Sequence, residues 1–350
     1  MSVEHDFRSF PAVPPPDTGR PSLPDDRALS EPAPPDEGPI RFDWRNNAIL
    51  FGLTVVSVFY VGRMWSLDPV APGVAGWIGG WKFAVPLLVI LLFHEFGHYI
   101  AARLHRVPAS LPYFLPLPIL SPFGTLGAVI LMPKRIASRK ALLDIGAAGP
   151  LAGLLVAIPI MIYGLSLSEL GPRVVGAHTQ EGQSLLYMAL KYLVYGSYPA
   201  QLDVHLHPTA GAAWAGFLVT FLNLLPFGQL DGGHVAYALF GERQNRFARW
   251  VFFAPLVVFA YNFVVFAWPV LRRGLDAGFA SIPSVAWMPV VSSLSTWVVL
   301  FVLLAVMRRG TGLDHPPVDD HSLSPLRKAV AVFTLAFFVL LFMPSPWIVY

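Results

Sequence analysis

Apolar segments of about twenty residues recur along this chain and constrain its fold more than any other feature. They lie at roughly 47–65, 82–103, 142–165, 210–230, 249–270, 285–307 and 328–347. A helix of about 20 apolar residues is long enough to cross a bilayer. Only 13% of the 350 residues are charged, whereas about 25% is usual in a soluble protein. The sequence therefore predicts an all-α polytopic membrane protein with about seven transmembrane helices.

The second of these segments carries a metal-binding motif. The run LLFHEFGHYIAARLH, residues 91–105, contains His94, Glu95 and His98 in an H-E-x-x-H pattern. Residues four apart lie on one face of a helix, so the two imidazoles can bind one metal ion, with Glu95 beside a metal-bound water. Ionisable groups inside a bilayer-length segment are costly and mark function by default. The motif predicts metal chemistry inside the membrane.

A third metal ligand has to come from elsewhere in the chain. Catalytic zinc takes three protein ligands, and because the chain has no cysteine the third is His, Asp or Glu. We favour Asp231, which follows helix-breaking residues in NLLPFGQLDGG that let a carboxylate turn inward. Asp144 is one rival, although Lys140 nearby suits it better to a salt bridge at an interface. His234 is the other rival.

The stretch 106–135 is apolar, but it does not fit a single helix. It is interrupted by Pro108, Pro112, Pro116, Pro118 and Pro122. We interpret it as a re-entrant or interfacial loop that ends in a short strand, Gly124–Met132. Irregular backbone at membrane depth is tolerated only where protein buries it or water reaches it. The loop therefore predicts a cavity next to the H-E-x-x-H motif.

The chain divides into three parts by composition. We expect 1–45 to form a disordered cytoplasmic tail, because its first 40 residues hold ten prolines and few aromatic residues. We expect 46–240 to form a transmembrane core and 241–350 to form accessory transmembrane helices. Within the core, the run SLLYMALKYLVYG at 184–196 is typical of an interfacial helix.

The distribution of lysine and arginine predicts the orientation in the membrane. Basic clusters follow 82–103 and 210–230 and flank the facing ends of 285–307 and 328–347. The positive-inside rule then places these loops and the amino terminus in the cytoplasm, with Arg272 and Arg273 as an exception. The H-E-x-x-H motif and Asp231 both fall toward the cytoplasmic ends of their segments. Because these residues account for the net charge of +3, we expect a lipid bilayer and no nucleic acid as partner.

Four motifs give the chain a resemblance to the site-2 protease family of intramembrane zinc metalloproteases. They are HEFGH at 94–98, GTLGAVILMP at 124–133, AAGPLAG at 147–153 and NLLPFGQLDGGH at 223–234. The resemblance implies a three-helix core made of the second, third and fourth segments. It also implies one zinc ion per chain, with His94, His98 and Asp231 as ligands and Glu95 as the catalytic acid and base.

The function implied is hydrolysis of peptide bonds in transmembrane substrate proteins, near the cytoplasmic side of the bilayer. We expect Asn223 to steady the substrate backbone or the oxyanion. The strand containing Gly124 and Gly127 offers backbone groups to which an unwound substrate can add as an extra strand. The setting we expect is a multi-pass protein of a cell membrane of prokaryotic type, with a cytoplasmic amino terminus.

Two other functions use the same ligands. A membrane-anchored zincin that acts on soluble peptides needs a water-facing catalytic domain, and no segment of the chain is polar enough to form one. A membrane metal transporter should show repeated halves or several ligand positions along a path. The chain shows one tight site and no repeat, so both remain alternatives to the leading interpretation.

Overall fold

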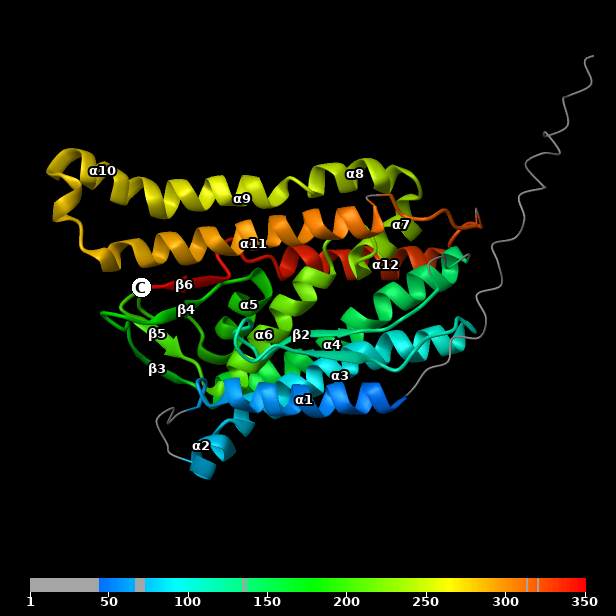
Figure 1. Ribbon diagram of the computed structural model, residues 1–350, viewed down its shortest axis with the longest axis horizontal. Coiled ribbons are helices and arrows are strands. Elements are labelled where there is room, and N and C mark those ends of the chain that lie inside the picture. The colour runs from blue at the N-terminus through cyan, green and yellow to red at the C-terminus, as the bar shows by residue number, and fades with distance from the viewer. Residues whose placement is uncertain (1–43, 67–72, 134–135, 137, 313, 320) are drawn as a thin grey trace, which may run out of the picture. The chain divides into compact units, whose positions relative to one another are not determined.

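A computed structural model describes residues 44–66, 73–133, 136, 138–312, 314–319 and 321–350. The expected tail, 1–45, lies outside these residues except for its last two positions. Residues from Phe42 onward form one compact unit. Its described residues are mostly helical, with three small two-stranded sheets (Figure 1).

The first part of the unit contains the helices of the expected core. They are α1 (Trp44–Gly62), α2 (Gly73–Gly79), α3 (Trp81–Leu104), α4 (Arg139–Ser166), α5 (Leu185–Tyr195) and α6 (Pro208–Asn223). Helices α3, α4 and α6 pack against one another, as predicted for the second, third and fourth segments. The fourth segment is shorter than expected, because its helix ends at Asn223 and 224–230 form a loop.

Small residues allow α4 to lie close to both of its neighbours. A Cβ atom built on Gly97 of α3 would lie 2.5 Å from the carbonyl oxygen of Ala148 in α4. A Cβ atom on Gly164 of α4 would lie 2.4 Å from the backbone nitrogen of Ala210 in α6. Neither position accepts a side chain without moving a helix, so the packing depends on glycine at both contacts.

The proline-rich stretch after α3 forms a hairpin, which confirms the expected strand and adds a partner to it. Strand β1 (Tyr113–Pro116) pairs in antiparallel fashion with β2 (Thr125–Val129). Side chains of α1 and of the turn after it hold the hairpin: Asn47 donates to the carbonyl of Leu111 at 2.8 Å, and Trp65 donates to that of Pro122 at 3.2 Å. These bonds satisfy carbonyl groups that a proline-rich loop leaves unpaired.

Two further sheets correct the all-α expectation. Strand β3 (Glu169–Pro172) pairs with β5 (Leu202–His205), and β4 (Thr179–Glu181) pairs with β6 (Trp347–Val349). These strands have three or four residues and show no clear alternation of apolar and polar residues. The partner of β4 also lies at the other end of the chain. Short strands paired over such a separation leave no local pattern in the sequence.

The expected core ends with α7 (Asp231–Phe240), and the rest of the unit contains the accessory helices. These are α8 (Arg243–Val251), α9 (Ala254–Asn262), η2 (Phe263–Ala267), α10 (Trp268–Ala277), η3 (Phe279–Ser281), η4 (Ser284–Trp287), α11 (Met288–Thr311) and α12 (Pro325–Leu340). Figure 1 shows α9 and α11 on the side opposite α1. The last predicted segment, 328–347, is helical only as far as Leu340, and prolines at 344 and 346 precede β6.

Four helical segments among the described residues are long and apolar enough to cross a membrane. They are Trp81–Leu104, Arg139–Ser166, Arg243–Ala277 and Ser284–Gly310. The other three predicted spans correspond to α1, α6 and α12, and the last two have 16 residues each. The described part of the chain is thus mostly helical, with four candidate membrane spans.

Candidate metal centre

Three predicted ligands meet at one point in the unit. The Nε2 atoms of His94 and His98 each lie 3.2 Å from Oδ2 of Asp231 and 3.3 Å from each other. Ligand atoms of one tetrahedral zinc ion, each about 2.0–2.2 Å from the metal, are separated by roughly this distance. His94 and His98 are buried, and the side chain of Asp231 is 17% exposed. The donor set and its spacing therefore fit one zinc ion.

The neighbouring helix α4 is shaped around the two imidazoles. A Cβ atom on Gly149 would lie 2.0 Å from Nε2 of His98, and one on Gly153 would lie 3.2 Å from Cβ of His94. The sequence did not predict that these glycines provide space for the ligand rings, although their position in AAGPLAG, a motif shared with the family, was a signal for it.

A hydrogen bond fixes the ring of His98. Its Nδ1 lies 2.8 Å from the carbonyl oxygen of Ile145 in α4. A carbonyl only accepts, so Nδ1 carries a proton, and in the neutral ring the free lone pair is at Nε2, the atom that faces Asp231. The tautomer needed for metal binding is thus determined by the backbone of α4.

Asp231 reaches the histidines because the chain folds back sharply between α6 and α7. A Cβ atom on Gly232 would lie 1.9 Å from the carbonyl oxygen of Leu224, and one on Gly233 would lie 2.3 Å from that of Gly228. These contacts exclude any side chain at either glycine. The two glycines after Asp231 therefore allow the close turn that brings this carboxylate to α3.

The two rival ligands have other partners. Asp144 accepts a hydrogen bond from Arg327 Nη2 at 2.7 Å and lies 2.8 Å from His105 Nε2, so it is in an ion-pair network, as its sequence context favoured. Nδ1 of His234 lies 2.8 Å from Nε2 of His315. Within the described residues, no second group of three His, Cys, Asp or Glu side chains has the spacing of a metal site.

The remaining predicted site residues differ in their distance from the metal ligands. Glu95 is 6% exposed and lies on α3 between the two histidines. Asn223, at the end of α6, has its Nδ2 only 3.2 Å from Nε2 of His94. Gly124 directly precedes β2, and Gly127 lies within it. Their φ values, +78° and +94°, favour glycine. No described contact joins these two glycines to the ligands, so their role stays a prediction.

An H-E-x-x-H helix and a distant aspartate define a metallopeptidase-type zinc site in a protein with several candidate membrane spans. The model of peptidase family M50 matches residues 82–262, which is more than half of the chain. The chain belongs to peptidase family M50, and the resemblance to site-2 proteases is confirmed.

Curated plant proteins are similar to this chain. It is 35% identical over 164 residues to a probable zinc metalloprotease EGY1, chloroplastic, of Arabidopsis thaliana, covering 45% of this chain and 29% of that protein. It is 31% identical over 200 residues to a probable zinc metalloprotease EGY2, chloroplastic, of Oryza sativa subsp. japonica, covering 56% of this chain and 36% of that protein. The similarity thus spans about a third of the length of these relatives. No solved structure matches the chain.

Proposed function

We propose that the chain is an intramembrane zinc endopeptidase that hydrolyses peptide bonds of transmembrane proteins near the cytoplasmic side of the bilayer. The observation that carries this proposal is the cluster of His94, His98 and Asp231, whose ligand atoms lie 3.2–3.3 Å apart. The two histidines lie on α3, a helix of bilayer length, and Asp231 is the first residue of the short helix α7. Membership of a family of peptidases supports peptide hydrolysis as the reaction.

The proposed topology extends the four candidate spans to about seven. Helices α1, α6 and α12 would complete the set, with 46–240 as the catalytic core and 241–350 as accessory helices. The clusters of basic residues support a cytoplasmic amino terminus in a prokaryotic-type cell membrane. In this orientation the ligands lie near the cytoplasmic ends of α3 and α6, and α3, α4 and α6 form the three-helix catalytic core.

The proposed mechanism assigns one task to each residue around the metal centre. Zinc, when bound, polarises the scissile carbonyl and lowers the pKa of water toward neutrality. Glu95 accepts the proton of the attacking water and returns it to the leaving amine. Asn223, beside His94, donates a hydrogen bond from Nδ2 to the substrate carbonyl oxygen as negative charge develops there.

The hairpin beside α3 supports a way to present the substrate. A peptide bond inside a helix is shielded by its own hydrogen bonds and has to be unwound before hydrolysis. Strand β2 has one partner, β1, so its second edge is available for an extended substrate segment. Gly127 lies on this strand, and a Cβ atom built there would meet nothing within 4 Å. The strand therefore leaves room for a substrate backbone to approach.

The central experiment compares wild-type protein with Glu95→Gln in liposomes that contain a single-span test substrate. We expect Glu95→Gln to abolish cleavage while retaining one zinc ion per chain, because Glu95 is not among the clustered ligands. Asn223→Ala should lower kcat by about 10²-fold or more, as loss of an oxyanion donor does. Undiminished cleavage by Asn223→Ala would remove that residue's proposed role.

The same preparation separates the alternatives. Zinc flux into liposomes without proteolysis would replace the protease proposal by a transporter. Cleavage of a soluble protein such as casein, with the membrane substrate left intact, would favour a membrane-anchored zincin. Trapping with Glu95→Gln, followed by identification of the bound membrane proteins, would then define the natural substrates.

A further inference from the structure

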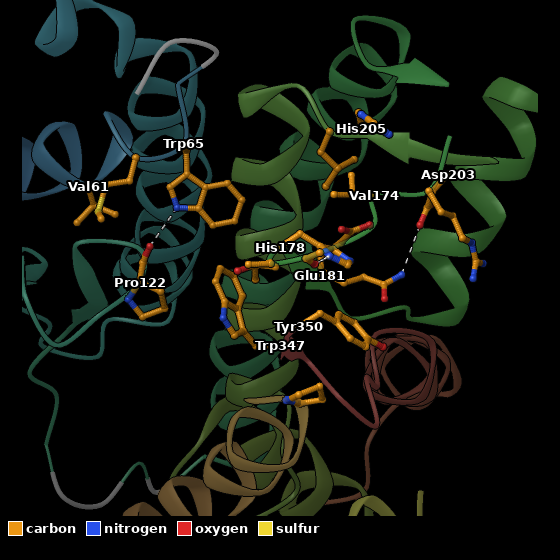
Figure 2. Close-up of a pocket in the computed structure, with 18 of the residues that line it drawn as sticks. Val61, Trp65, Pro122, Val174, His178, Glu181, Asp203, His205, Trp347 and Tyr350 are labelled. Carbon is orange, nitrogen blue, oxygen red and sulfur yellow. Dashed lines mark hydrogen bonds between the residues drawn. The ribbon is translucent and has the colours of Figure 1, made fainter. Parts of the chain in front are cut away.

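A cavity of about 1330 Å³ opens where the small sheets meet the ends of the helices (Figure 2). Its walls include residues of β4, β5 and β6, the tip of the β1–β2 hairpin and the start of α11. None of the predicted metal-site residues lines it. It is therefore a second site within the described residues, separate from the metal centre.

The hairpin connects this cavity to the region of the metal centre. Residues 118–122, at its tip, form one wall of the cavity. Residues Ile130 and Met132, beyond the other end of β2, pack in the same cluster as Tyr99, one position after the ligand His98. The part of α3 between its start and His94 is roughly 20 Å long. An extended chain rises about 3.3 Å per residue, so about six residues cover the same distance. A substrate segment laid along the hairpin thus reaches the cavity.

Strand β4 presents at the cavity an edge that pairs with no second strand among the described residues. On its other edge, His178 and Tyr350 exchange backbone hydrogen bonds, and Gly182 donates to the carbonyl of Pro346 in the segment that leads to β6. Alternate residues of an antiparallel strand face opposite edges, so the backbone groups of Thr179 and Glu181 face away from β6. The carbonyl of Glu181 accepts a hydrogen bond from Nε2 of Gln183 at 3.2 Å, which an added strand would replace. Both residues line the cavity. Such an edge can pair with an extended peptide.

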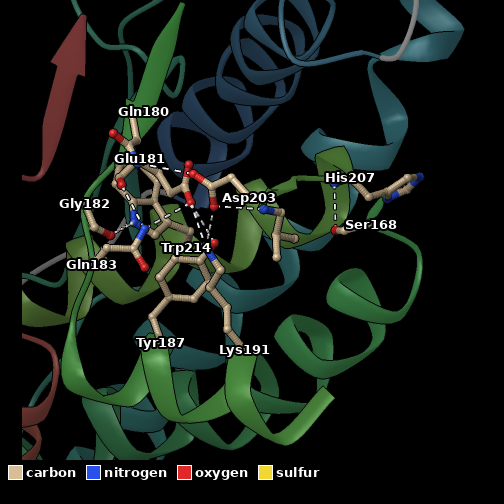
Figure 3. A network of polar contacts seen from close by, with 11 residues as sticks. Ser168, Gln180, Glu181, Gly182, Gln183, Tyr187, Lys191, Asp203, His207 and Trp214 are labelled. Carbon is tan, nitrogen blue, oxygen red and sulfur yellow. Dashed lines mark hydrogen bonds and ion pairs between the residues drawn. The ribbon is translucent and has the colours of Figure 1, made fainter. Parts of the chain in front are cut away.

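Two carboxylates, Glu181 and Asp203, line the cavity and contact one buried ammonium group (Figure 3). Nζ of Lys191 lies 3.7 Å from Oε1 of Glu181 and 3.4 Å from Oδ1 of Asp203. Lys191 is 5% exposed and does not line the cavity, whereas both carboxylates do. With both acids ionised, this part of the wall has a net charge of about −1, which favours a cationic ligand group.

Aromatic rings add to the affinity for a cation. Trp65, Trp347 and Tyr350 line the cavity, and the ring of His178 stacks on Tyr350 with centroids 4.9 Å apart. Lysine and arginine side chains bind both carboxylates and aromatic faces. Arg173, the fully charged basic residue of the lining, is exposed at the rim. An anionic lipid headgroup would meet the carboxylate wall, so the charges favour a peptide over a phospholipid.

We propose that this cavity binds an extended segment of the substrate protein by strand addition to β4, with a lysine or arginine of that segment beside Glu181 and Asp203. The segment lies about six residues or more from the scissile bond, on the side away from the cytoplasm. This inference rests on the proposed function, because the segment belongs to the protein that the metal centre cleaves. The cavity then selects substrates by a sequence outside the cleaved bond.

The experiment uses the full chain with Glu95→Gln, so that binding is measured without cleavage. The probe is an equimolar pool of acetylated, amidated octapeptides composed of Val, Thr, Trp and either Lys or Asp, with copies N-methylated at every residue so that neither edge of the extended peptide can donate a backbone hydrogen bond. Ala286→Trp places an indole in the cavity, and Val291→Trp, 63% exposed on α11 and outside the lining, is the matched control. Retained peptides are identified by mass spectrometry.

We expect Lys peptides to be enriched at least tenfold over Asp peptides and over their N-methylated copies. Enrichment should be lost in Ala286→Trp and kept in Val291→Trp. Glu181→Gln should still retain peptides, with Lys and Asp peptides retained about equally. An unfolded protein would retain neither, so this change of preference is distinguishable from unfolding. Equal retention by the Ala286→Trp and Val291→Trp proteins overturns the proposal. Retention of the N-methylated copies also overturns it. The proposal is overturned as well if the Ala286→Trp substitution displaces bound phosphatidylglycerol and leaves peptide retention unchanged.

Failure of this inference is distinguishable from failure of the proposed function. Wild-type cleavage of the single-span test substrate together with no peptide retention would remove only the cavity proposal. Peptide retention without any cleavage would remove the proposed protease function and with it the identification of the peptide as substrate.

Discussion

Buried carboxylates occur at both the metal centre and the cavity, but their partners differ. Asp231 faces the imidazoles of His94 and His98. Nδ1 of His98 donates to the carbonyl of Ile145, so in the neutral ring Nε2 has the lone pair that can bind a metal. At the cavity, Glu181 and Asp203 share the ammonium group of Lys191. A carboxylate beside neutral nitrogen donors lacks a counter-charge, which a metal cation supplies. A carboxylate beside a lysine already has its counter-charge. The comparison shows that the partner, rather than the acid, decides whether a buried carboxylate binds metal.

The strongest test of this comparison removes one carboxylate from each region. Asp231→Ala should weaken zinc affinity by more than about 100-fold and abolish cleavage. This effect exceeds the usual effect of losing a residue that only hydrogen-bonds to a metal ligand. Asp203→Ala should retain one zinc ion per chain. Metal content of the purified proteins, measured by plasma mass spectrometry, checks both outcomes. Zinc retained by Asp231→Ala would disprove its assignment as a ligand.

A second test leaves every ligand in place and changes only the space around it. Gly149→Ala puts a Cβ atom into the ring of His98, so we expect zinc binding to weaken at least about tenfold. Gly52→Ala is the control, because a Cβ atom on this glycine of α1 would meet nothing within 4 Å. Equal zinc affinity in the two variants would show that α4 does not hold the imidazole.

The third test removes the counter-charge at the cavity. Lys191→Met leaves two carboxylates without their cation, so the free energy of unfolding should fall by about 3–5 kcal/mol. Zinc content should not change. Adding Glu181→Gln and Asp203→Asn to Lys191→Met should recover part of the stability, because no buried charge then remains unpaired. Thermal unfolding of the single and triple variants measures the difference.

The smallest expected effect is a pH dependence at the start of α6. Burial, with the charge of Lys82 nearby, lowers the pKa of His207 below its ordinary 6.5. Its Nδ1 accepts a hydrogen bond from the backbone N–H of Thr209 and caps the helix. Because the unfolded chain binds the proton more readily, stability should decrease as the pH falls from about 6.5 toward the lowered pKa.

His207→Asn provides the comparison for this effect. Asparagine can cap a helix in the same way but does not titrate. Its melting temperature should therefore depend less on pH than that of the wild-type protein over this range. An identical pH dependence in both proteins would exclude His207 as the cause.

The sequence predicted more of the metal centre than of the cavity. His94, His98 and Asp231 were all named as ligands, and the helix that carries the two histidines was located to within a few residues. The short helix α7, which begins at Asp231, was not predicted. The sequence predicted a cavity next to the H-E-x-x-H motif, whereas none of the predicted metal-site residues lines this one. Its position was not anticipated, because its walls come from six separated parts of the chain and include strands of three or four residues. The short hairpin was anticipated in part, since its prolines excluded a helix.

The sequence alone determined the type of ligand, the helical spacing of the two histidines and the apolar segments, because donor chemistry and periodicity belong to contiguous residues. Tertiary structure alone brought Asp231 within 3.2 Å of a histidine 137 positions away, placed α4 glycines against the imidazoles and joined β4 to the last strand. These arrangements depend on contacts between distant parts of the chain, and the favourable energy of such contacts exists only once the helices have packed.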